Sequence, residues 1–344
     1  MDPNDKFNLI VDGLDEVIGE KELINIIQER DLKLYWGTAP TGKPHIGYLK
    51  PIFKICQFLK AGCDVTILFA DLHAYLDEMK SSWDQLKYRT EYYRDVITET
   101  LKVLDAPIDK LHFVKGTDYQ LSSEYTLNVY KLMSKMSLHD AIKSGAEVVK
   151  QSKDPKMASL LYPGLQALDE EFLGVDAQFG GVDQRKIFML ADKYLPKLEY
   201  KKRVHLMNPM IPSFNSGNPD EKMSSSDENS KIDLLDVPKV IKKKIGKAFC
   251  EEGNINCGLL SFVKHIIIPI EQFKDNCFTI NRTEEYGGVC EYKIYDDLEN
   301  DFRDKKLHPV DLKQGVSAWL IDLLEPVREY FNKEDIQENM KKSY

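Results

Sequence analysis

The feature that most constrains the fold is the alternation of short apolar runs with longer helical stretches through the first two thirds of the chain. Runs of this length that are almost wholly apolar are typical of strands buried on both faces. Their alternation with helices predicts an α/β fold with a doubly wound parallel sheet. The expected strands are 32–37, 64–71, 111–115, 176–179 and 204–207, and the expected helices are 46–59, 83–104, helical stretches within 122–173, and 183–194.

A polar segment at 213–231, rich in Ser, Asn and Gly, interrupts this pattern and is typical of a functional loop or a linker. The rest of the 344-residue chain is predicted to be mainly helical, so we expect one domain at 1–231 and a smaller helical domain at 232–344. The stretch 237–249 has helical spacing with an apolar face. Its opposite face carries Lys239, Lys242, Lys243 and Lys247. Such a face is ordinarily solvated, and contact with phosphate is the secondary interpretation.

Composition narrows the class of protein. No run approaches the roughly 20 apolar residues of a membrane span, and the polar, acidic N-terminus does not resemble a signal or transit peptide, so we expect a cytoplasmic protein. The six cysteines lack zinc spacing, and no dedicated metal site is predicted. A net charge of −9 leaves RNA binding open, because phosphate contacts need local rather than global positive charge.

The segment from Gly37 to Pro44 nearly matches the phosphate-binding loop pattern G-x-x-x-x-G-K-[S/T]. Pro40 and Pro44 lack N–H donors, and Pro44 also removes the hydroxyl that binds Mg²⁺, so this interpretation is disfavoured. Pro44 instead suits the start of a helix. Residues 45–48 are then an exposed first turn, where free N–H groups favour phosphate. An equally good interpretation of this segment alone is a strand–turn–helix junction with an incidental histidine.

A second segment, Lys222-Met-Ser-Ser-Ser226, lies in the polar loop at 213–231. The pairing of H-I-G-Y at 45–48 with K-M-S-S-S at 222–226 resembles the two signatures of class I aminoacyl-tRNA synthetases, usually H-I-G-H and K-M-S-K-S. Tyr48 replaces the second histidine and Ser225 the second lysine, which removes one cation from the expected phosphate clamp. Both variants are familiar in eukaryotic-type tyrosyl-tRNA synthetases.

Three further segments, at 69–75, 115–121 and 177–186, extend a resemblance to tyrosyl-tRNA synthetases of the archaeal–eukaryotic type over essentially the whole chain. The resemblance implies a Rossmann-like catalytic domain at 1–231 and a helical anticodon-binding domain at 232–344. It also implies a homodimer, with an insertion at about 118–174 carrying the interface.

The resemblance implies a role for each matching residue. Tyr162, Gln166 and Asp169 have the spacing of one helix face, which taken alone favours a plain surface helix. In the tyrosine site, the phenol hydroxyl would be held by Tyr35 and Asp169. The ammonium and carboxylate would be surrounded by Tyr162, Gln166 and Gln184. The side-chain pocket would be lined by Leu68, His73, Tyr119 and Gln120. For ATP, the residues would be Gly37, Thr38, His45, Gly47, Gly181, Asp183, Lys222 and Met223, with His45, Lys222 and Ser224 as the catalytic groups.

The implied activity is activation of L-tyrosine by ATP with Mg²⁺, which would enter with the nucleotide, followed by transfer to tRNA(Tyr). Tyrosyl-tRNA synthetases are themselves the standard example of rejecting phenylalanine without editing, at roughly 10⁵-fold, so no editing domain is expected. Arg185 would contact the acceptor stem, and Tyr286, His308 and Asp311 would read the anticodon. Alternatively, Tyr286 packs at a turn and Asp311 caps the following helix.

Three other functions compete with this one. A tryptophanyl-tRNA synthetase shares both signatures, but its pocket serves an indole. A nucleotidyltransferase of the same superfamily would activate a small acid without tRNA. A synthetase-derived binding protein would lack activity. The pairing of Tyr35 with Asp169 favours a phenol over an indole, and the helical C-terminal region favours an RNA substrate.

Overall fold

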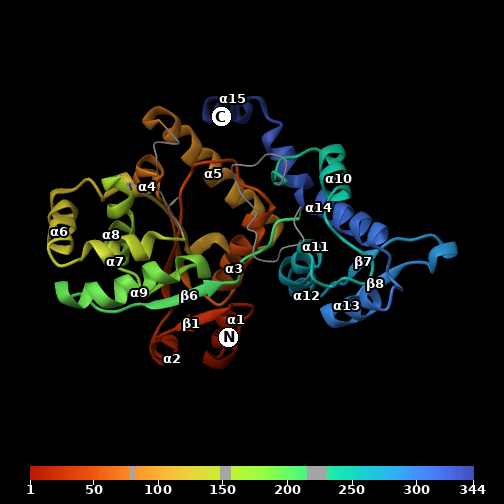
Figure 1. Cartoon of the computed structure of the whole chain (residues 1–344), viewed down its shortest axis with the longest axis horizontal. Helices are drawn as coiled ribbons and strands as arrows, with labels where there is room; N and C mark the ends of the chain where they lie inside the picture. Colours follow the sequence, from red (N-terminus) through yellow and green to blue (C-terminus); the bar gives the residue numbers. More distant parts are fainter. Residues whose placement is uncertain (78–81, 148–155, 215–230) are drawn as a thin grey trace.

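A six-stranded sheet forms the centre of the computed structural model, which describes residues 1–77, 82–147, 156–214 and 231–344 (Figure 1). The strand order is β1-β6-β5-β2-β3-β4, in which β1 is antiparallel to β6 and the other neighbours are parallel. This confirms the predicted α/β class. The strands are β1 Glu16–Ile18, β2 Lys33–Thr38, β3 Asp64–Phe69, β4 Leu111–Lys115, β5 Ala177–Gly181 and β6 Val204–Asn208.

The helices around the sheet agree with the predicted stretches, but the helices Pro3–Val11, Glu20–Glu29 and Asp71–Leu76 were not predicted, and the strand predicted at 64–71 ends at Phe69. The described residues of 122–173 contain three helices, and the helix predicted at 46–59 is a 3₁₀ turn, Ile46–Tyr48, followed by α3. The edge strand β1 was not predicted, because three residues are too few for a periodic pattern. The helices are α1 Pro3–Val11, α2 Glu20–Glu29, α3 Leu49–Lys60, α4 Asp71–Leu76, α5 Trp83–Val103, α6 Ser123–Met133, α7 Leu138–Gly145, α8 Met157–Phe172 and α9 Arg185–Tyr194.

The position of β2 determines where a ligand can bind. From β2 the chain builds β3 and β4 on one side and later β5 and β6 on the other, so the order reverses between β2 and β5. Ligands of open α/β sheets bind at such a reversal, outside the carboxyl ends of the strands. Gly37 of β2 is in register with Leu68 of β3, and each lies one residue before the end of its strand, which places both residues near that edge.

The C-terminal region is mainly helical, as predicted, but it also contains a short hairpin that the sequence did not reveal. The two strands pair antiparallel, with Phe278 opposite Tyr292 and Ile280 opposite Cys290. Each has three residues, again too few for a pattern. The elements are α10 Pro238–Gly246, α11 Gly258–Phe262, a π-helical turn Val263–Ile267, α12 Ile268–Phe273, β7 Phe278–Ile280, β8 Cys290–Tyr292, α13 Tyr295–Arg303, α14 Pro309–Phe331 and α15 Glu334–Ser343.

The C-terminal helices share an apolar core with the sheet-bearing part. Phe53 of α3 meets Phe273 of α12 edge-on at 5.3 Å between ring centroids, and both belong to the main hydrophobic cluster. Helix α15 lies along α5, on the far side of the sheet from the N-terminus (Figure 1). The boundary expected at 231/232 stays a prediction. The lysine face expected on 237–249 is exposed, while Ile241 and Ile245 of α10 are buried.

Candidate active site

A recess lies at the carboxyl ends of β2 and β5, where the chain order of the sheet reverses. Eight residues that the sequence assigned to tyrosine or ATP line it together. Ala39, Ala70 and Gln178 also line it and were not predicted. The full lining is Tyr35, Gly37, Ala39, Leu68, Ala70, His73, Tyr162, Gln166, Asp169, Gln178 and Gln184.

Asp169 of α8 has the most unusual environment in this recess. Tyr119, Gln120 and Tyr125 all donate to its Oδ1 atom, at 2.7, 2.8 and 2.9 Å. Its other oxygen, Oδ2, is buried and has no hydrogen-bond partner among the described residues. Burial raises the pKa of Asp169 to about 7, although the three donors oppose the shift. A buried carboxylate oxygen without a partner is costly, so it is a natural acceptor for a ligand hydroxyl.

Tyr125 was missed by the sequence analysis because it lies well outside the segments that line the sheet edge. It is fully buried on α6 and donates to Asp169, and its hydroxyl is also 2.9 Å from the Leu165 carbonyl oxygen. Tyr119 lies outside the recess lining but contacts Asp169 directly. The predicted partner Tyr35 is buried, and its hydroxyl donates to the Gln166 carbonyl oxygen at 3.2 Å. Tyr35 and Asp169 therefore face one recess without a hydrogen bond between them.

Four other lining residues are polar or aromatic and come from three helical segments. The side-chain amide of Gln166 donates to Gln184 Oε1 at 2.8 Å. The rings of His73 and Tyr162 meet edge-on with centroids 4.5 Å apart. Burial lowers the pKa of His73 to about 4, so its imidazole is neutral at pH 7. Tyr162, Gln166 and Asp169 all line the recess, so the predicted helix face is not a plain surface face.

A second cavity of about 260 Å³ adjoins the first, and Gln184 lines both. Four of the residues predicted to bind ATP line this cavity. Of the others, Gly37 lines the first recess, and the Thr38 hydroxyl lies 3.4 Å from the Tyr48 hydroxyl. Asn208, the last residue of β6, and Met210, two residues further on, were not predicted. The lining is Trp36, His45, Gly47, Tyr48, Lys50, Pro51, Gly180, Gly181, Asp183, Gln184, Asn208, Pro209, Met210 and Ile211.

The helix start at 45–48 differs from its prediction. His45, rather than Pro44, is the residue that caps the turn, because its Nδ1 atom accepts from the Gly47 N–H at 3.1 Å. The Ile46 N–H donates to the Ile232 carbonyl oxygen at 2.9 Å. These N–H groups are therefore not free for phosphate, and the turn is not exposed, because His45 and Ile46 are buried.

His45 keeps one donor for the cavity. Burial lowers its pKa to about 4, so the ring is neutral at pH 7. Since Nδ1 accepts the Gly47 N–H, the single ring proton of the neutral form is on Nε2. The ring lines the second cavity, and this N–H is the group that it can offer there.

Backbone pairing joins the 45–48 turn to the chain that follows the polar loop. Ile46 N–H donates to Ile232, and the Leu234 N–H donates to the Pro44 carbonyl oxygen at 3.3 Å. His45 and Asp233 form an antiparallel bridge. The first signature is thus tied to the residues just after the second. Lys222, Met223 and Ser224 themselves lie outside the described residues.

The predicted RNA-contacting residues gather in the C-terminal region, except Arg185 at the start of α9, which pairs with Glu16 at 2.6 Å. Tyr286 has 67% of its surface exposed, so the alternative that it packs at a turn is wrong. His308, not Asp311, caps α14, because its Nδ1 accepts from the Val310 N–H at 3.2 Å. Asp311 lies in the first turn of that helix, 4.0 Å from Arg282.

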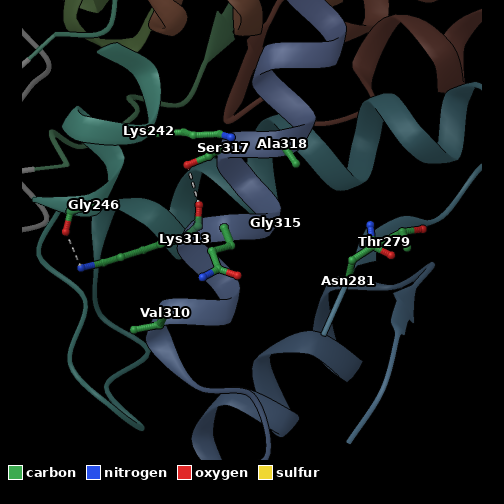
Figure 2. Close-up of a pocket in the computed structure, with 10 residues that line it drawn as sticks. Lys242, Gly246, Thr279, Asn281, Val310, Lys313, Gly315, Ser317 and Ala318 are labelled. Atoms are coloured by element: carbon green, nitrogen blue, oxygen red, sulfur yellow. Dashed lines mark hydrogen bonds between the residues drawn. The ribbon is translucent and has the colours of Figure 1, made fainter. Parts of the chain in front are cut away.

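A cavity of about 610 Å³ lies beside these residues, between α10, α14 and the β7–β8 hairpin (Figure 2). Lys313 crosses one end, where its Nζ atom donates to the Gly246 carbonyl oxygen at 3.2 Å. The sequence analysis missed this cavity, although its lysine face supplies Lys242. The lining is Lys242, Gly246, Thr279, Asn281, Val310, Lys313, Gln314, Gly315, Ser317 and Ala318.

Neither a metal-binding cluster nor a membrane-spanning helix is present among the described residues. No group of three or more His, Cys, Asp or Glu among them could hold a metal ion. Within the same residues, no helix is long and apolar enough to cross a membrane.

The family model for tRNA synthetases class I (W and Y) matches residues 28–325. The chain belongs to this family. Among its relatives, the chain is 56% identical to the cytoplasmic tyrosine–tRNA ligase of Gallus gallus, over 99% of this chain and 64% of that protein. It is 50% identical to the cytoplasmic tyrosine–tRNA ligase of Saccharomyces cerevisiae, over 100% of this chain and 89% of that protein. The chain thus spans less than two thirds of the length of the Gallus gallus relative.

A solved structure of a class I synthetase agrees with the fold over nearly its whole length. The tyrosyl-tRNA synthetase of Archaeoglobus fulgidus, complexed with L-tyrosine, is 35% identical and has a TM-score of 0.86 over 95% of this chain and 99% of that one. The predicted resemblance to archaeal and eukaryotic tyrosyl-tRNA synthetases is confirmed. The family model spans both the tryptophan and the tyrosine members, so the choice of amino acid depends on the pocket.

Proposed function

We propose that this class I synthetase is a tyrosyl-tRNA synthetase, which activates L-tyrosine with ATP and transfers it to tRNA(Tyr). The observation that carries the proposal is Asp169, whose Oδ1 is held by three donors while Oδ2 is buried and without a partner among the described residues. A phenol O–H from tyrosine supplies the missing donor. Phenylalanine would leave the carboxylate oxygen unpaired, which such sites reject strongly.

The same recess favours tyrosine over tryptophan. A phenol hydroxyl both donates and accepts hydrogen bonds, whereas an indole N–H only donates. Asp169 is an acceptor for that hydroxyl. Tyr35 lines the same recess, and its O–H, which donates to the Gln166 carbonyl oxygen at 3.2 Å, would turn to donate to the substrate oxygen. A phenol meets both groups, while an indole would leave Tyr35 without a substrate partner. The relatives that carry the name tyrosine–tRNA ligase support this choice.

ATP would occupy the adjoining cavity, with its α-phosphate toward Gln184, the residue common to both cavities. Asp183 would accept from the ribose hydroxyls, and His45 Nε2 would donate to a phosphate oxygen. Mg²⁺ would enter on the triphosphate, in keeping with its preference for phosphate and water oxygens. Lys222, Met223 and Ser224 remain sequence predictions for the phosphate clamp.

The chemistry needs no nucleophile from the protein. The tyrosine carboxylate attacks the α-phosphate, forms tyrosyl-adenylate and expels pyrophosphate. A ribose hydroxyl of the 3′-terminal adenosine of the tRNA then attacks the tyrosyl carbonyl and expels AMP. The protein holds the two reactants in adjoining cavities, and donors such as His45 stabilise the charge that develops on phosphate oxygens.

The tRNA would contact the chain in two places. Arg185, at the start of α9 and next to Gln184, would contact the acceptor end. The exposed ring of Tyr286 can stack on an unpaired base, and Asp311 can accept from a base edge. The cavity beside them contributes Lys242 and Lys313 for phosphate (Figure 2). The names of the relatives support a cytoplasmic protein.

A homodimer formed through α6–α8 completes the proposal. These helices lie together at the end of the molecule opposite the C-terminal helices (Figure 1). Large apolar side chains are exposed there, and an exposed patch of this kind marks an interaction surface. They are Leu121, Leu127, Tyr130, Leu138 and Met157, with exposed fractions from 53% to 72%.

The direct test is amino-acid-dependent exchange between ATP and pyrophosphate, followed by aminoacylation of tRNA. Tyrosine is expected to support exchange, and phenylalanine and tryptophan are not. Purified chain should then charge tRNA(Tyr) with tyrosine. Exchange with tryptophan and none with tyrosine would overturn the specificity. Exchange without charging of any tRNA would instead indicate an amino-acid-activating enzyme without an RNA substrate.

A further inference from the structure

The side chain of Arg282 is mostly covered at the junction of the two segments that carry the proposed anticodon contacts. It follows β7 by two residues, and 9% of its side chain is exposed. One of these segments is the hairpin connection with Tyr286. The other runs from the loop after α13 into α14 and carries His308 and Asp311. Neither the sequence motifs nor the proposed mechanism uses Arg282.

The guanidinium reaches four groups on these segments. On the hairpin, Nε donates to the Gly288 carbonyl oxygen at 3.0 Å and Nη2 donates to Cys290 Sγ at 2.7 Å. On the other segment, Nη1 donates to the Lys306 carbonyl oxygen at 3.0 Å and lies 4.0 Å from Asp311 Oδ2. A rigid fork of donors can hold several acceptors at fixed angles, which a single ammonium cannot do.

The turn that presents Tyr286 is built around this side chain. The Tyr286 and Gly288 N–H groups both donate to the Thr283 carbonyl oxygen, at 2.9 and 3.0 Å. Gly287 and Gly288 have φ of +96° and +71°, a conformation that favours glycine. A Cβ atom added at Gly287 would lie 3.1 Å from Arg282 Nη2, so the guanidinium fills the inside of the turn.

We infer that Arg282 is the positioning residue for anticodon recognition: it fixes the Tyr286 turn against the start of α14, so that one unpaired base stacks on Tyr286 while its edge meets Asp311. The inference rests on the proposed function, because it assumes that the RNA ligand is tRNA. Tyr286 is exposed and Arg282 is not, which separates the group that touches RNA from the group that holds it in place.

The test compares two reactions of the full-length chain, because only one of them uses tRNA. Arg282→Gln should leave tyrosine-dependent pyrophosphate exchange unchanged and raise KM for tRNA(Tyr) by about ten- to a hundred-fold, since charged hydrogen bonds are lost. Arg282→Lys should behave like Arg282→Gln, because lysine keeps the charge without the fork. Arg303→Gln is the matched control, since Arg303 bonds Asn300 and Glu299 within its own helix.

A double-mutant cycle separates positioning from general stability. Tyr286→Ala should raise KM for tRNA(Tyr) by itself. If Arg282 acts through Tyr286, the KM of the double variant for tRNA(Tyr) should be no higher than that of the poorer single variant, because both substitutions then remove the same contact with RNA. Fully multiplicative effects would contradict the inference.

The remaining outcomes distinguish this inference from the function on which it rests. An Arg282→Gln variant with unchanged KM for tRNA(Tyr), or rescue by Arg282→Lys, would overturn the inference alone. Loss of pyrophosphate exchange together with a lower unfolding temperature would show a structural role and also overturn it. A wild-type chain that charges no tRNA would overturn the RNA part of the proposed function and the inference with it.

Discussion

Asp169 is the residue on which the proposed specificity for tyrosine rests. A buried carboxylate is disfavoured unless its oxygens have donors. Three protein donors converge on one oxygen, which leaves the second for the substrate. Because the donors Tyr119, Gln120 and Tyr125 are themselves held in the fold, the acceptor is in place before the ligand arrives.

Replacing Asp169 with Asn should lower kcat/KM for tyrosine in pyrophosphate exchange by about ten- to a hundred-fold, the loss of one charged hydrogen bond. The residual rate with phenylalanine should fall far less, because phenylalanine does not use the carboxylate. The measurement is the ratio of kcat/KM for tyrosine to kcat/KM for phenylalanine. Equal losses for both amino acids would remove Asp169 from hydroxyl recognition.

The same residue predicts a pH dependence. The ionised carboxylate is the better acceptor, and its pKa is raised to about 7. In the wild type, kcat/KM for tyrosine should therefore rise as the pH increases through about 7, and Asp169→Asn should lack this rise. The stability of the fold depends on pH in the opposite direction. Because the pKa of Asp169 is higher in the folded chain than in the unfolded chain, its contribution to stability is fully present below about pH 4 and is lost as pH rises through 7.

At the scale of elements, β5 and α9 meet so closely that the site depends on a glycine. Gly180 lies near the end of β5, and a Cβ atom there would lie 2.9 Å from both Gln184 Oε1 and Phe188 Cζ. Gln184 lines both proposed substrate cavities. The small residue at this position is therefore what lets α9 approach the sheet and present Gln184.

Gly180→Ala should move Gln184 and lower tyrosine-dependent exchange, and overpacking should destabilise the fold by about 1–3 kcal/mol. Kinetics and denaturant unfolding measure the two effects. Gly246→Ala is the control, because a Cβ atom there meets nothing within 4 Å. If both variants behaved alike, the close approach of α9 would not be what sets the position of Gln184.

In the whole molecule, the sites proposed for amino-acid activation and for RNA recognition lie at different positions along one connected core. The sheet part carries both proposed substrate cavities, and the C-terminal region carries the cavity of Figure 2. Rings such as Phe53 and Phe273 join the two parts. Helix α8 also lines the first recess, but the exposed apolar side chains of α6–α8 are available to a second copy of the chain.

Wild-type chain is expected to be a dimer by sedimentation, and Leu138→Glu should shift it toward monomer, because a charge buried in an apolar interface is costly. Leu138 has 63% of its surface exposed, so the substitution should not unfold the monomer. Ile108→Glu, an exposed apolar position near β4, is the control. A monomeric wild type would contradict the proposal.

Much of the site could be predicted from local pattern. The strand ends, the i, i+4, i+7 spacing of Tyr162, Gln166 and Asp169, and the H-I-G-Y segment are contiguous features, and they lead to residues that line the two cavities. Tyr125, Gln178 and Arg282 could not be found in this way. Each acts through contacts with residues distant in sequence, and no periodicity marks such contacts.

The sequence by itself determined the α/β class, the helical C-terminal region and the family, because buried strands, amphipathic helices and signature motifs are local patterns. Only the tertiary structure decided which acceptors the backbone N–H groups of the 45–48 turn bind. Gly47 donates to the His45 ring, and Ile46 to Ile232, a residue beyond the polar loop. A helix start leaves N–H groups without intrahelical partners, and only the folded chain shows which distant acceptors satisfy them.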